Sequence, residues 1–251
     1  MGFVDKTRFD GKIYLGLPAD FTDLIIQKRV ELTKKIPDFC NKNINLVDIG
    51  CGNGASIFML ADSFKTCNGI DIFPKNKEVF NKVKQEHHYN NCNIKLVDVE
   101  NEKIAQQFDR LICFEVIEHF RYEKSVASLY EATNPGGLVA ITVPNKWWIF
   151  ETHGARLPLL PWNRVPFFSW LPTFIHERYA NARIYTKRRI KKLLEHHGFK
   201  VKKMQYITAP MDVLPDGWLR KFLRKTIFRG LTTSIPFLST AIFIEAVKPN
   251  K

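Results

Sequence analysis

The sequence has no uncharged apolar run long enough to cross a bilayer and no C-x-x-C pair. Its five cysteines, Cys40, Cys51, Cys67, Cys92 and Cys113, lie far apart. Several of them stand inside apolar runs, where a reduced thiol packs as a small hydrophobic side chain. We therefore expect a cytoplasmic protein that is soluble or, at most, bound peripherally to a membrane face.

The chain is also short of targeting features and of acidic residues. Its opening segment, MGFVDKTRFDGK, lacks the apolar core of a signal peptide, and Lys6 stands where the myristoylation pattern requires Ser or Thr. Only 25 Asp and Glu oppose 38 Lys and Arg, which gives a formal net charge of +13. Such a surface attracts phosphates, anionic lipids or nucleic acid, so the charge indicates a class of partner but no reaction.

What is present is an alternation of short apolar runs with longer helical patterns over 251 residues, enough for a single large domain, residues 1–251. This alternation is typical of an α/β fold whose parallel sheet carries helices on both faces. Seven strands are expected, at residues 46–49, 67–72, 94–97, 111–114, 138–143, 201–207 and 240–247. Helical patterns cover residues 55–63, 75–86, 122–133 and 186–196, the last ended by Gly198, and NPGG at 134–137 predicts a turn.

Two stretches interrupt the alternation and predict functional insertions, because both are longer than ordinary loops. Residues 146–182 are rich in Trp, Phe and Pro, and residues 208–235 contain a basic, helix-like piece.

A glycine-rich segment follows the first expected strand. Gly50, Gly52 and Gly54 fit G-x-G-x-x-G/A, the pattern in which glycines let the backbone approach a nucleotide at a helix N-terminus. Asp48 decides between two kinds of nucleotide. A carboxylate two residues before the first glycine would repel the pyrophosphate of a dinucleotide, but it suits the ammonium and sulfonium of S-adenosylmethionine. The segment therefore predicts a phosphate-free, positively charged nucleoside.

Two further carboxylates follow the next expected strands. Asp71, in NGIDIF, lies about 20 residues beyond the glycines, the spacing at which a carboxylate accepts the ribose hydroxyls. Asp98, in IKLVDVE, could accept from the adenine amino group while Val99 packs on the ring. Three carboxylates then end three successive strands at one sheet edge, where ligands bind in open α/β sheets. The alternative for each is a solvated turn residue or a helix N-cap.

The motifs VDIGCGNG, GIDIF, LVDVE, FDRLICFEVIEHF and NPGGLVAITVPN stand in an order and spacing that resembles class I S-adenosylmethionine-dependent methyltransferases, particularly the group with the ubiquinone-biosynthesis O-methyltransferases. The resemblance covers residues 40–145 and 183–248. It implies a Rossmann-like, seven-stranded, mostly parallel sheet whose last strand is antiparallel, with the cofactor-binding core at about 40–145. The implied cofactor site consists of Asp48, Gly50, Cys51, Gly52, Gly54, Asp71, Ile72, Asp98, Val99, Phe114 and Glu115.

The segment EVIEH places Glu115, Glu118 and His119 at i, i+3 and i+4, so a helical turn would bring them to one face. It resembles the metal-binding segment of O-methyltransferases that act on catechol-type quinone precursors and on the 3′-terminal ribose of small RNAs. Those enzymes add a downstream histidine, for which His176 or His153 is available. The resemblance thus implies Mg²⁺ or another divalent metal on Glu115, Glu118, His119 and His176.

The alternative needs no metal. Glu115 would then contact the methionine end of the cofactor through its backbone, Glu118 would be solvated and His119 would line the acceptor pocket. In either case His119 is the leading candidate for the general base, with Glu118 as the second catalytic candidate.

Both insertions allow two interpretations. Trp147, Trp148, Trp162 and Trp170, interleaved with prolines, predict either a lid over the core or an acceptor pocket that opens at a membrane surface. In GWLRKFLRKTIFRG, residues 217–230, a helix would separate an apolar face from a basic one. That pattern is typical of an interfacial amphipathic helix, and equally of a core-docked helix with a solvated basic face.

These patterns predict an O-methyltransferase acting on a small or lipid-linked acceptor, such as a quinone precursor, an isoprenoid or a glycan intermediate. RNA is the second candidate acceptor, because basic residues crowd RIYTKRRIKKLL. The glycine pattern keeps a nicotinamide-dependent oxidoreductase as a rival, and a methyltransferase-like binding module without activity is the third possibility.

Overall fold

The computed structural model describes residues 21–155 and 165–250. The opening segment with Lys6, and Trp162 of the aromatic stretch, lie outside the described residues. In the part that the structure describes, no helix is both long and apolar enough to span a bilayer.

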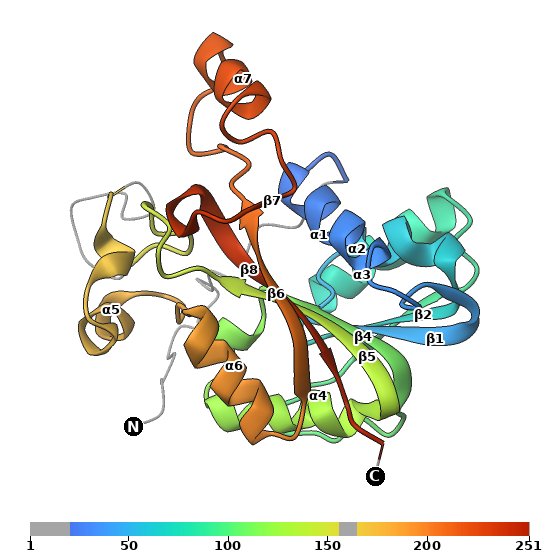
Figure 1. Ribbon diagram of the computed structural model, residues 1–251. Coiled ribbons are helices and arrows are strands. Elements are labelled where there is room, and N and C mark those ends of the chain that lie inside the picture. Colours follow the sequence, from blue (N-terminus) through green and yellow to red (C-terminus); the bar gives the residue numbers. More distant parts are fainter. Residues whose placement is uncertain (1–20, 156–164, 251) are drawn as a thin grey trace.

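One mixed sheet of eight strands forms the centre of the molecule, in the order β3-β2-β1-β4-β5-β8-β6-β7 (Figure 1). Strands β3, β2, β1, β4 and β5 pair in parallel, and β8 is inserted antiparallel between β5 and β6. The strands are β1 Asn41–Ile49, β2 Phe64–Asp71, β3 Cys92–Leu96, β4 Phe108–Phe114, β5 Thr133–Pro144, β6 Lys200–Thr208, β7 Thr232–Thr233 and β8 Ser239–Val247. The predicted Rossmann-like sheet with an antiparallel last strand is confirmed.

Two details of the sheet differ from the prediction. The eighth strand, β7, pairs only Thr232 and Thr233 with the end of β6, and a two-residue strand carries no periodic signal. The NPGG segment lies inside β5, where the register against β4 shifts between Thr133 and Leu138. Gly136 in this segment has φ +74°, so the predicted turn is a bulge in the strand.

Helices cover both faces of the sheet: α1 Leu24–Lys34, α2 Ala55–Leu60, α3 Pro74–Glu86, α4 Ala127–Ala132, α5 Thr173–Tyr179, α6 Lys187–His196 and α7 Trp218–Lys225. The start of α6 is capped by Thr186, whose hydroxyl accepts from the amide of Arg189 at 3.2 Å. Gly198, with φ +95°, ends α6 as predicted. Helices α1 and α5 were not predicted.

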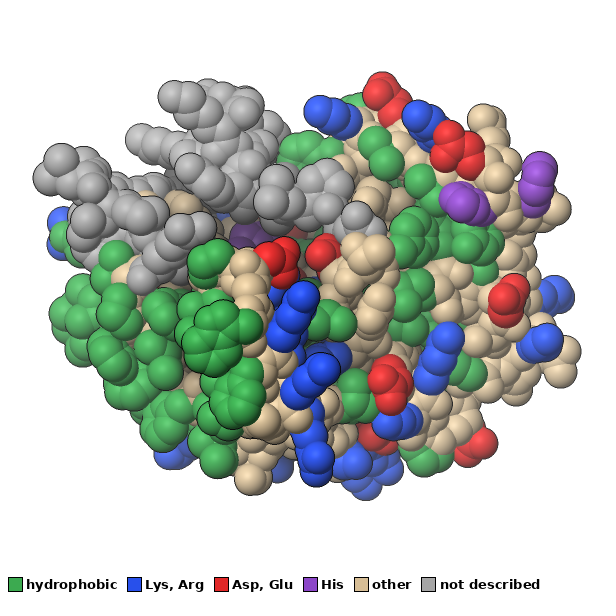
Figure 2. Space-filling model, turned by 90° about the horizontal axis from the view of Figure 1, so that it is seen from above, with side chains coloured by type: hydrophobic (Ala, Val, Ile, Leu, Met, Phe, Trp, Pro, Cys, Tyr) green, Lys and Arg blue, Asp and Glu red, His purple; other side chains and the backbone are tan. Residues whose placement is uncertain are grey.

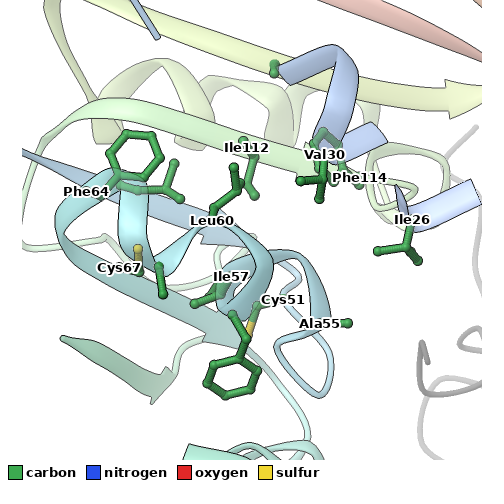
Figure 3. Close-up of a cluster of buried hydrophobic side chains, with 14 of the residues drawn as sticks. Ile26, Val30, Cys51, Ala55, Ile57, Leu60, Phe64, Cys67, Ile112 and Phe114 are labelled. Carbon is green, nitrogen blue, oxygen red and sulfur yellow. The ribbon is translucent and has the colours of Figure 1, made fainter. Parts of the chain in front are cut away.

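Neighbouring residues of the central strands pack on opposite faces of the sheet, which is why each of these strands contains a run of consecutive apolar residues. Leu46 belongs to the same buried cluster as Val30 of α1 and Ile57 of α2, which Figure 3 labels. Val47 belongs to the core on the other face, with Ile190 of α6. Fully burying each such side chain contributes about 1.5–3 kcal/mol.

Both predicted insertions leave the sheet and are closed at their bases. In residues 146–182, here called the aromatic insertion, the amide of Lys146 donates to the carbonyl of Tyr185 at 2.9 Å. Residues 209–231, here called the α7 excursion, carry α7 away from the body of the molecule (Figure 1). Lys28 of α1 closes that excursion, because its Nζ donates to the carbonyls of Thr208 at 2.9 Å and Gly230 at 3.1 Å.

Candidate functional site

The glycine segment joins the end of β1 to the start of α2 and is held by the end of β2. The amide of Gly50 donates to the carbonyl of Ile70 at 2.7 Å. Gly50 has φ +73°, and a Cβ added there would lie 2.3 Å from Cγ2 of Val116. Gly54 has φ +88° at the N-terminus of α2, and its Cβ would lie 2.4 Å from the ring of Phe80. Both positions therefore require glycine for backbone conformation and for space.

Asp48 and Asp71 form an acidic wall beside this segment. Both are buried, with exposed fractions of 3% and 7%. Oδ2 of Asp71 accepts from the amide of Gly52 at 2.8 Å, so the carboxylate also orders the glycine segment. Burial raises the pKa of Asp48 well above its ordinary value, and the negative charge of Asp71 raises it further. A cation placed here would favour the ionised form of Asp48.

Asp98 makes two contacts within its own turn. Its Oδ1 accepts from the amide of Glu100 at 3.0 Å, and its Oδ2 accepts from Nδ2 of Asn101 at 2.9 Å. Asp98 therefore stabilises a turn, which was the alternative prediction for this residue. Asp98 and the adjacent Val99 also line the cavity described next, so the turn presents them to a ligand.

A cavity of about 450 Å³ lies where β1, β2 and β4 end and where the chain leaves β3. Most of the predicted site residues line it: Asp48, Gly50, Cys51, Gly52, Asp71, Ile72, Asp98, Val99, Phe114, Glu115 and His119. Gly54 does not line it, since it serves the turn into α2. Glu118 is fully buried and does not line it either.

Arg29, which the sequence analysis missed, is the only Lys or Arg among the described residues that line this cavity. It comes from the unpredicted helix α1 and is 8% exposed. Its Nη2 lies 3.3 Å from Oε1 of Glu115. The available signal was weak: Arg29 stands three residues after Ile26 and one before Val30, both buried, so a cation occupies the apolar face of the helix.

Glu115 is held in an uncommon backbone conformation directly after β4. Its φ is +57°, and its amide donates to the carbonyl of Thr142 at 3.0 Å. A non-glycine residue in this region carries strain that the surrounding structure must impose. Burial raises the pKa of Glu115, and the charge of Arg29 opposes that effect.

Glu118, His119 and His153 form a compact group at the far end of the cavity, with one ligand atom from each within 4.8 Å of the others. The rings of His119 and His153 lie 5.0 Å apart, close to perpendicular. Neither carboxylate oxygen of Glu118 accepts a hydrogen bond from residues 21–155 or 165–250. Burial raises the pKa of Glu118 well above its ordinary value, and the charge of Glu115 raises it further.

The structure corrects the predicted set of four metal ligands. Nε2 of His176 lies 2.5 Å from Oε2 of Glu151, both side chains are buried, and His176 is not a member of the group. Glu115 pairs with Arg29 and is not in the group either. The histidine that folds back onto EVIEH is His153, the other residue considered above, because spacing along an insertion does not determine which residue returns to the sheet.

The surroundings of His153 favour its uncharged imidazole. Burial lowers its pKa well below the ordinary value, and neighbouring His119 and Arg29 lower it further. One contact orients the ring and one holds the backbone: Nδ1 lies 2.9 Å from the hydroxyl of Thr152, and the backbone amide of His153 donates to Oε1 of Glu151 at 3.0 Å. A neutral, oriented imidazole can accept a proton or bind a metal ion.

A second cavity, of about 270 Å³, adjoins the first and shares Thr152, Pro210 and Thr240 with it. Trp148 of the aromatic insertion and Met211 of the α7 excursion line it. The hydroxyl of Thr240 is buried and has no hydrogen-bond partner among the described residues. Both insertions therefore contribute walls to this second cavity.

Comparisons with known proteins agree with this architecture. Residues 24–203 match the family model described as a methyltransferase domain. A crystal structure of an S-adenosylmethionine-dependent methyltransferase from Mesorhizobium loti superposes with a TM-score of 0.61 at 12% identity, covering 91% of this chain and 100% of that one. Phosphoethanolamine N-methyltransferase 2 of Haemonchus contortus, solved with S-adenosyl-L-methionine, gives 0.58 at 16% identity, covering 89% of this chain and 52% of that one.

Curated relatives are similar over shorter stretches. A ubiquinone biosynthesis O-methyltransferase of Rickettsia typhi is 27% identical over 106 residues, 41% of this chain and 42% of that protein. An (S)-coclaurine N-methyltransferase of Papaver somniferum is 27% identical over 100 residues, 39% of this chain and 28% of that protein. The chain thus matches less than half the length of these relatives. Because the family model matches most of the chain, the protein belongs to the family of methyltransferase domains.

Proposed function

We propose that this protein transfers the methyl group of S-adenosylmethionine to a hydroxyl oxygen of a small or lipid-linked apolar acceptor. One observation carries the proposal: a single cavity runs from the acidic glycine segment at Asp48 to the imidazoles of His119 and His153. The first end suits a positively charged nucleoside, and the second suits a group that must lose a proton.

The residues at the first end fit S-adenosylmethionine, which supplies a methyl group on a positively charged sulfur when bound. Asp48 and Asp71 are buried carboxylates with mutual repulsion, which a cationic ligand would relieve. Arg29 is placed to bind a carboxylate, and the cofactor has one at its methionine end. A dinucleotide would bring its pyrophosphate against Asp48 instead.

The residues at the second end fit a proton acceptor for a hydroxyl. His119 lines the cavity, and His153 stands beside it as a neutral imidazole. We assign His119 the role of general base and His153 the role of orienting it. Glu118, buried against the pair, would stabilise positive charge that develops on an imidazole.

The same three side chains fit a divalent cation. Glu118 has two buried oxygens without a donor among the described residues, and both imidazoles present a ring within 4.8 Å of its carboxylate. Such an ion, when bound, would lower the pKa of an acceptor hydroxyl. Treatment with a chelator separates the two roles: loss of turnover that Mg²⁺ or Mn²⁺ restores assigns a metal, and unchanged turnover leaves His119 as the base.

An apolar acceptor is favoured by the second cavity. Trp148, Pro210, Met211 and Val213 give it apolar walls, and Glu151, Thr152, Asp212 and Thr240 complete its lining. Both carboxylates are already paired, Glu151 with His176 and Asp212 with Arg224. Apolar walls with a few oriented polar groups are typical of sites for small ligands.

Two measurements test the proposal. Calorimetry with S-adenosylhomocysteine and with NAD should show binding of the first only; binding of NAD alone would indicate an oxidoreductase, and no binding at millimolar ligand would indicate a module without activity. Labelled methyl transfer into extracts separated into lipid, glycan and RNA fractions should place the label in the lipid fraction, and His119→Ala should remove it. Label in the RNA or glycan fraction alone would overturn the acceptor assignment.

A further inference from the structure

Helix α7 turns its apolar side chains outward. The exposed fractions are 78% for Trp218, 46% for Leu219, 55% for Phe222 and 57% for Ile227, directly after the helix. No residue of α7 is buried. Water-exposed groups of large apolar side chains are uncommon on soluble proteins and mark a surface that contacts something else.

Two arginines of α7 hold the helix against the segment that precedes it in the α7 excursion. Arg220 donates to the carbonyl of Leu214 at 3.1 Å and pairs with Asp216. Arg224 donates to the carbonyl of Pro210 at 2.7 Å and pairs with Asp212.

Leu223 adds an apolar contact to a small core that contains Trp148, Met211 and Phe228. The core-docked helix with a solvated basic face, considered above, is therefore wrong. Two arginines face inward, and the apolar stripe faces outward.

Three further cations flank the stripe. Lys221 and Lys225 stand three residues after Trp218 and Phe222, so each lies beside an exposed aromatic ring on the helix surface, and Arg229 follows the helix. All three are exposed. Figure 2, which views the molecule from the α7 end, shows hydrophobic side chains gathered next to a line of Lys and Arg. We call Trp218, Leu219, Lys221, Phe222, Lys225, Ile227 and Arg229 the α7 surface.

We propose that the α7 surface docks on an anionic lipid bilayer. Trp and Phe between lysines match the boundary of a bilayer, where rings enter the interface and ammonium groups meet anionic headgroups. A second copy of the chain fits less well, since two-fold pairing of this stripe would place Lys221 and Lys225 against the same cations. The overall charge of +13 adds attraction to an anionic surface.

Docking by the α7 surface would also define a route for the acceptor, and only this route rests on the proposed function. Met211, Asp212 and Val213, at the root of the α7 excursion, line the second cavity. An acceptor held in the bilayer under α7 would therefore approach the histidines along a cavity whose walls include the docked segment itself.

Co-sedimentation of the full chain with vesicles tests the docking without methyl transfer. The probes are vesicles of phosphatidylcholine with 30% phosphatidylglycerol and vesicles of phosphatidylcholine alone. Wild type should bind the anionic vesicles. Trp218→Ala with Phe222→Ala should weaken this binding at least 10-fold, and Lys221→Gln with Lys225→Gln should weaken it about 30-fold. The matched control removes two exposed cations of α6, Arg188→Gln with Lys192→Gln, and should change binding less than 3-fold.

Quenching by brominated lipid adds a position-specific readout. Trp218→Phe should still bind the vesicles but lose most of the quenching seen in the wild type. The four α7 side chains are exposed, and circular dichroism of each variant checks that the fold is intact. Absence of wild-type binding at millimolar lipid would overturn the proposal, as would equal binding by the Trp218→Ala, Phe222→Ala variant. Self-association that this variant abolishes would assign the surface to a dimer instead. None of these outcomes depends on which acceptor is methylated.

Discussion

The two ends of the cavity are held in different ways. At the end with the glycine segment, the proposed cofactor end, consecutive strands and their turns bond to one another: Gly50 to Ile70, and Gly52 to Asp71. At the proposed acceptor end, His119 after β4 lies next to His153 from the aromatic insertion, and Pro210 comes from the α7 excursion. The cofactor end is therefore a property of the sheet edge, whereas the acceptor end is assembled from segments that leave the sheet. Changes at the first end should alter cofactor binding, and changes at the second should alter turnover alone.

The sharpest separation of the two ends is expected from His119→Ala. Loss of a general base typically lowers kcat by about 10²- to 10⁴-fold. The Kd for S-adenosylhomocysteine, measured by calorimetry, should stay within about 2-fold, because the carboxylates and glycines that bind it are untouched. His153→Gln should show the same division with a smaller loss of kcat. A parallel loss of S-adenosylhomocysteine binding would show that the two ends are not independent.

At the cofactor end, Gly50→Ala and Gly52→Ala form a matched pair. Both glycines have positive φ, but a Cβ at Gly50 meets Val116 at 2.3 Å, whereas a Cβ at Gly52 has no neighbour within 4 Å. Gly50→Ala should lower the free energy of unfolding by about 2–4 kcal/mol, and Gly52→Ala by about 1–2 kcal/mol, the cost of a left-handed backbone alone. Urea unfolding without ligand measures both. Equal losses would contradict the steric argument.

Asp48→Asn should move stability and binding in opposite directions. The raised pKa of Asp48 means that its contribution to stability is favourable below the unfolded-state pKa and is lost as pH rises toward the folded-state pKa. Removing the charge should therefore stabilise the ligand-free protein at pH 7 by about 0.5–2 kcal/mol. The same change should weaken S-adenosylmethionine binding about 10- to 100-fold, because a charge-assisted contact is lost. Unfolding curves and calorimetry on the same sample check both signs.

Proton linkage tests the electrostatic origin of that effect. Because a bound cation favours the ionised form of Asp48, binding of S-adenosylmethionine should release protons at pH values below the raised folded-state pKa. Affinity should then rise with pH by at most about 10-fold per pH unit. Calorimetry in two buffers that differ in ionisation enthalpy measures the release. Asp48→Asn should abolish it, and a variant that still releases the same number of protons would assign the linkage to another group.

The smallest effect is expected at the root of the α7 excursion. Lys28→Met removes two hydrogen bonds to the carbonyls of Thr208 and Gly230 and should lower the free energy of unfolding by about 1 kcal/mol. Burial lowers the pKa of Lys28 to about 8, and nearby Arg224 contributes to that shift. The unfolded chain therefore binds more protons between pH 8 and pH 10.5, so stability from this residue rises across that window. Lys28→Met should remove the rise, and proteolysis should cleave residues 209–231 several-fold faster.

The strands and most of the residues that line the cavity could be predicted because their signals are local. Strands buried on both faces are continuous apolar runs, such as the one around Leu46 and Val47, and a glycine pattern directly after a strand indicates a nucleotide turn. Local patterns did not reveal α1, whose apolar face is interrupted by Arg29. They also could not distinguish His153 from His176, since that depends on how the aromatic insertion folds back.

Local sequence was enough to predict seven of the eight strands, the glycine turn and the acidic strand ends, because each depends on neighbours a few residues away. Which histidine joins Glu118 and His119, and which face of α7 meets water, depends on contacts between segments that are distant in the sequence or in a loop. An amphipathic pattern does not say which face packs against the protein, because a helix with one apolar and one basic face can dock by either. Here Arg220 and Arg224 hydrogen-bond to carbonyls and pair with carboxylates of the α7 excursion. With the helix held in this orientation, Trp218 and Phe222 are exposed to solvent.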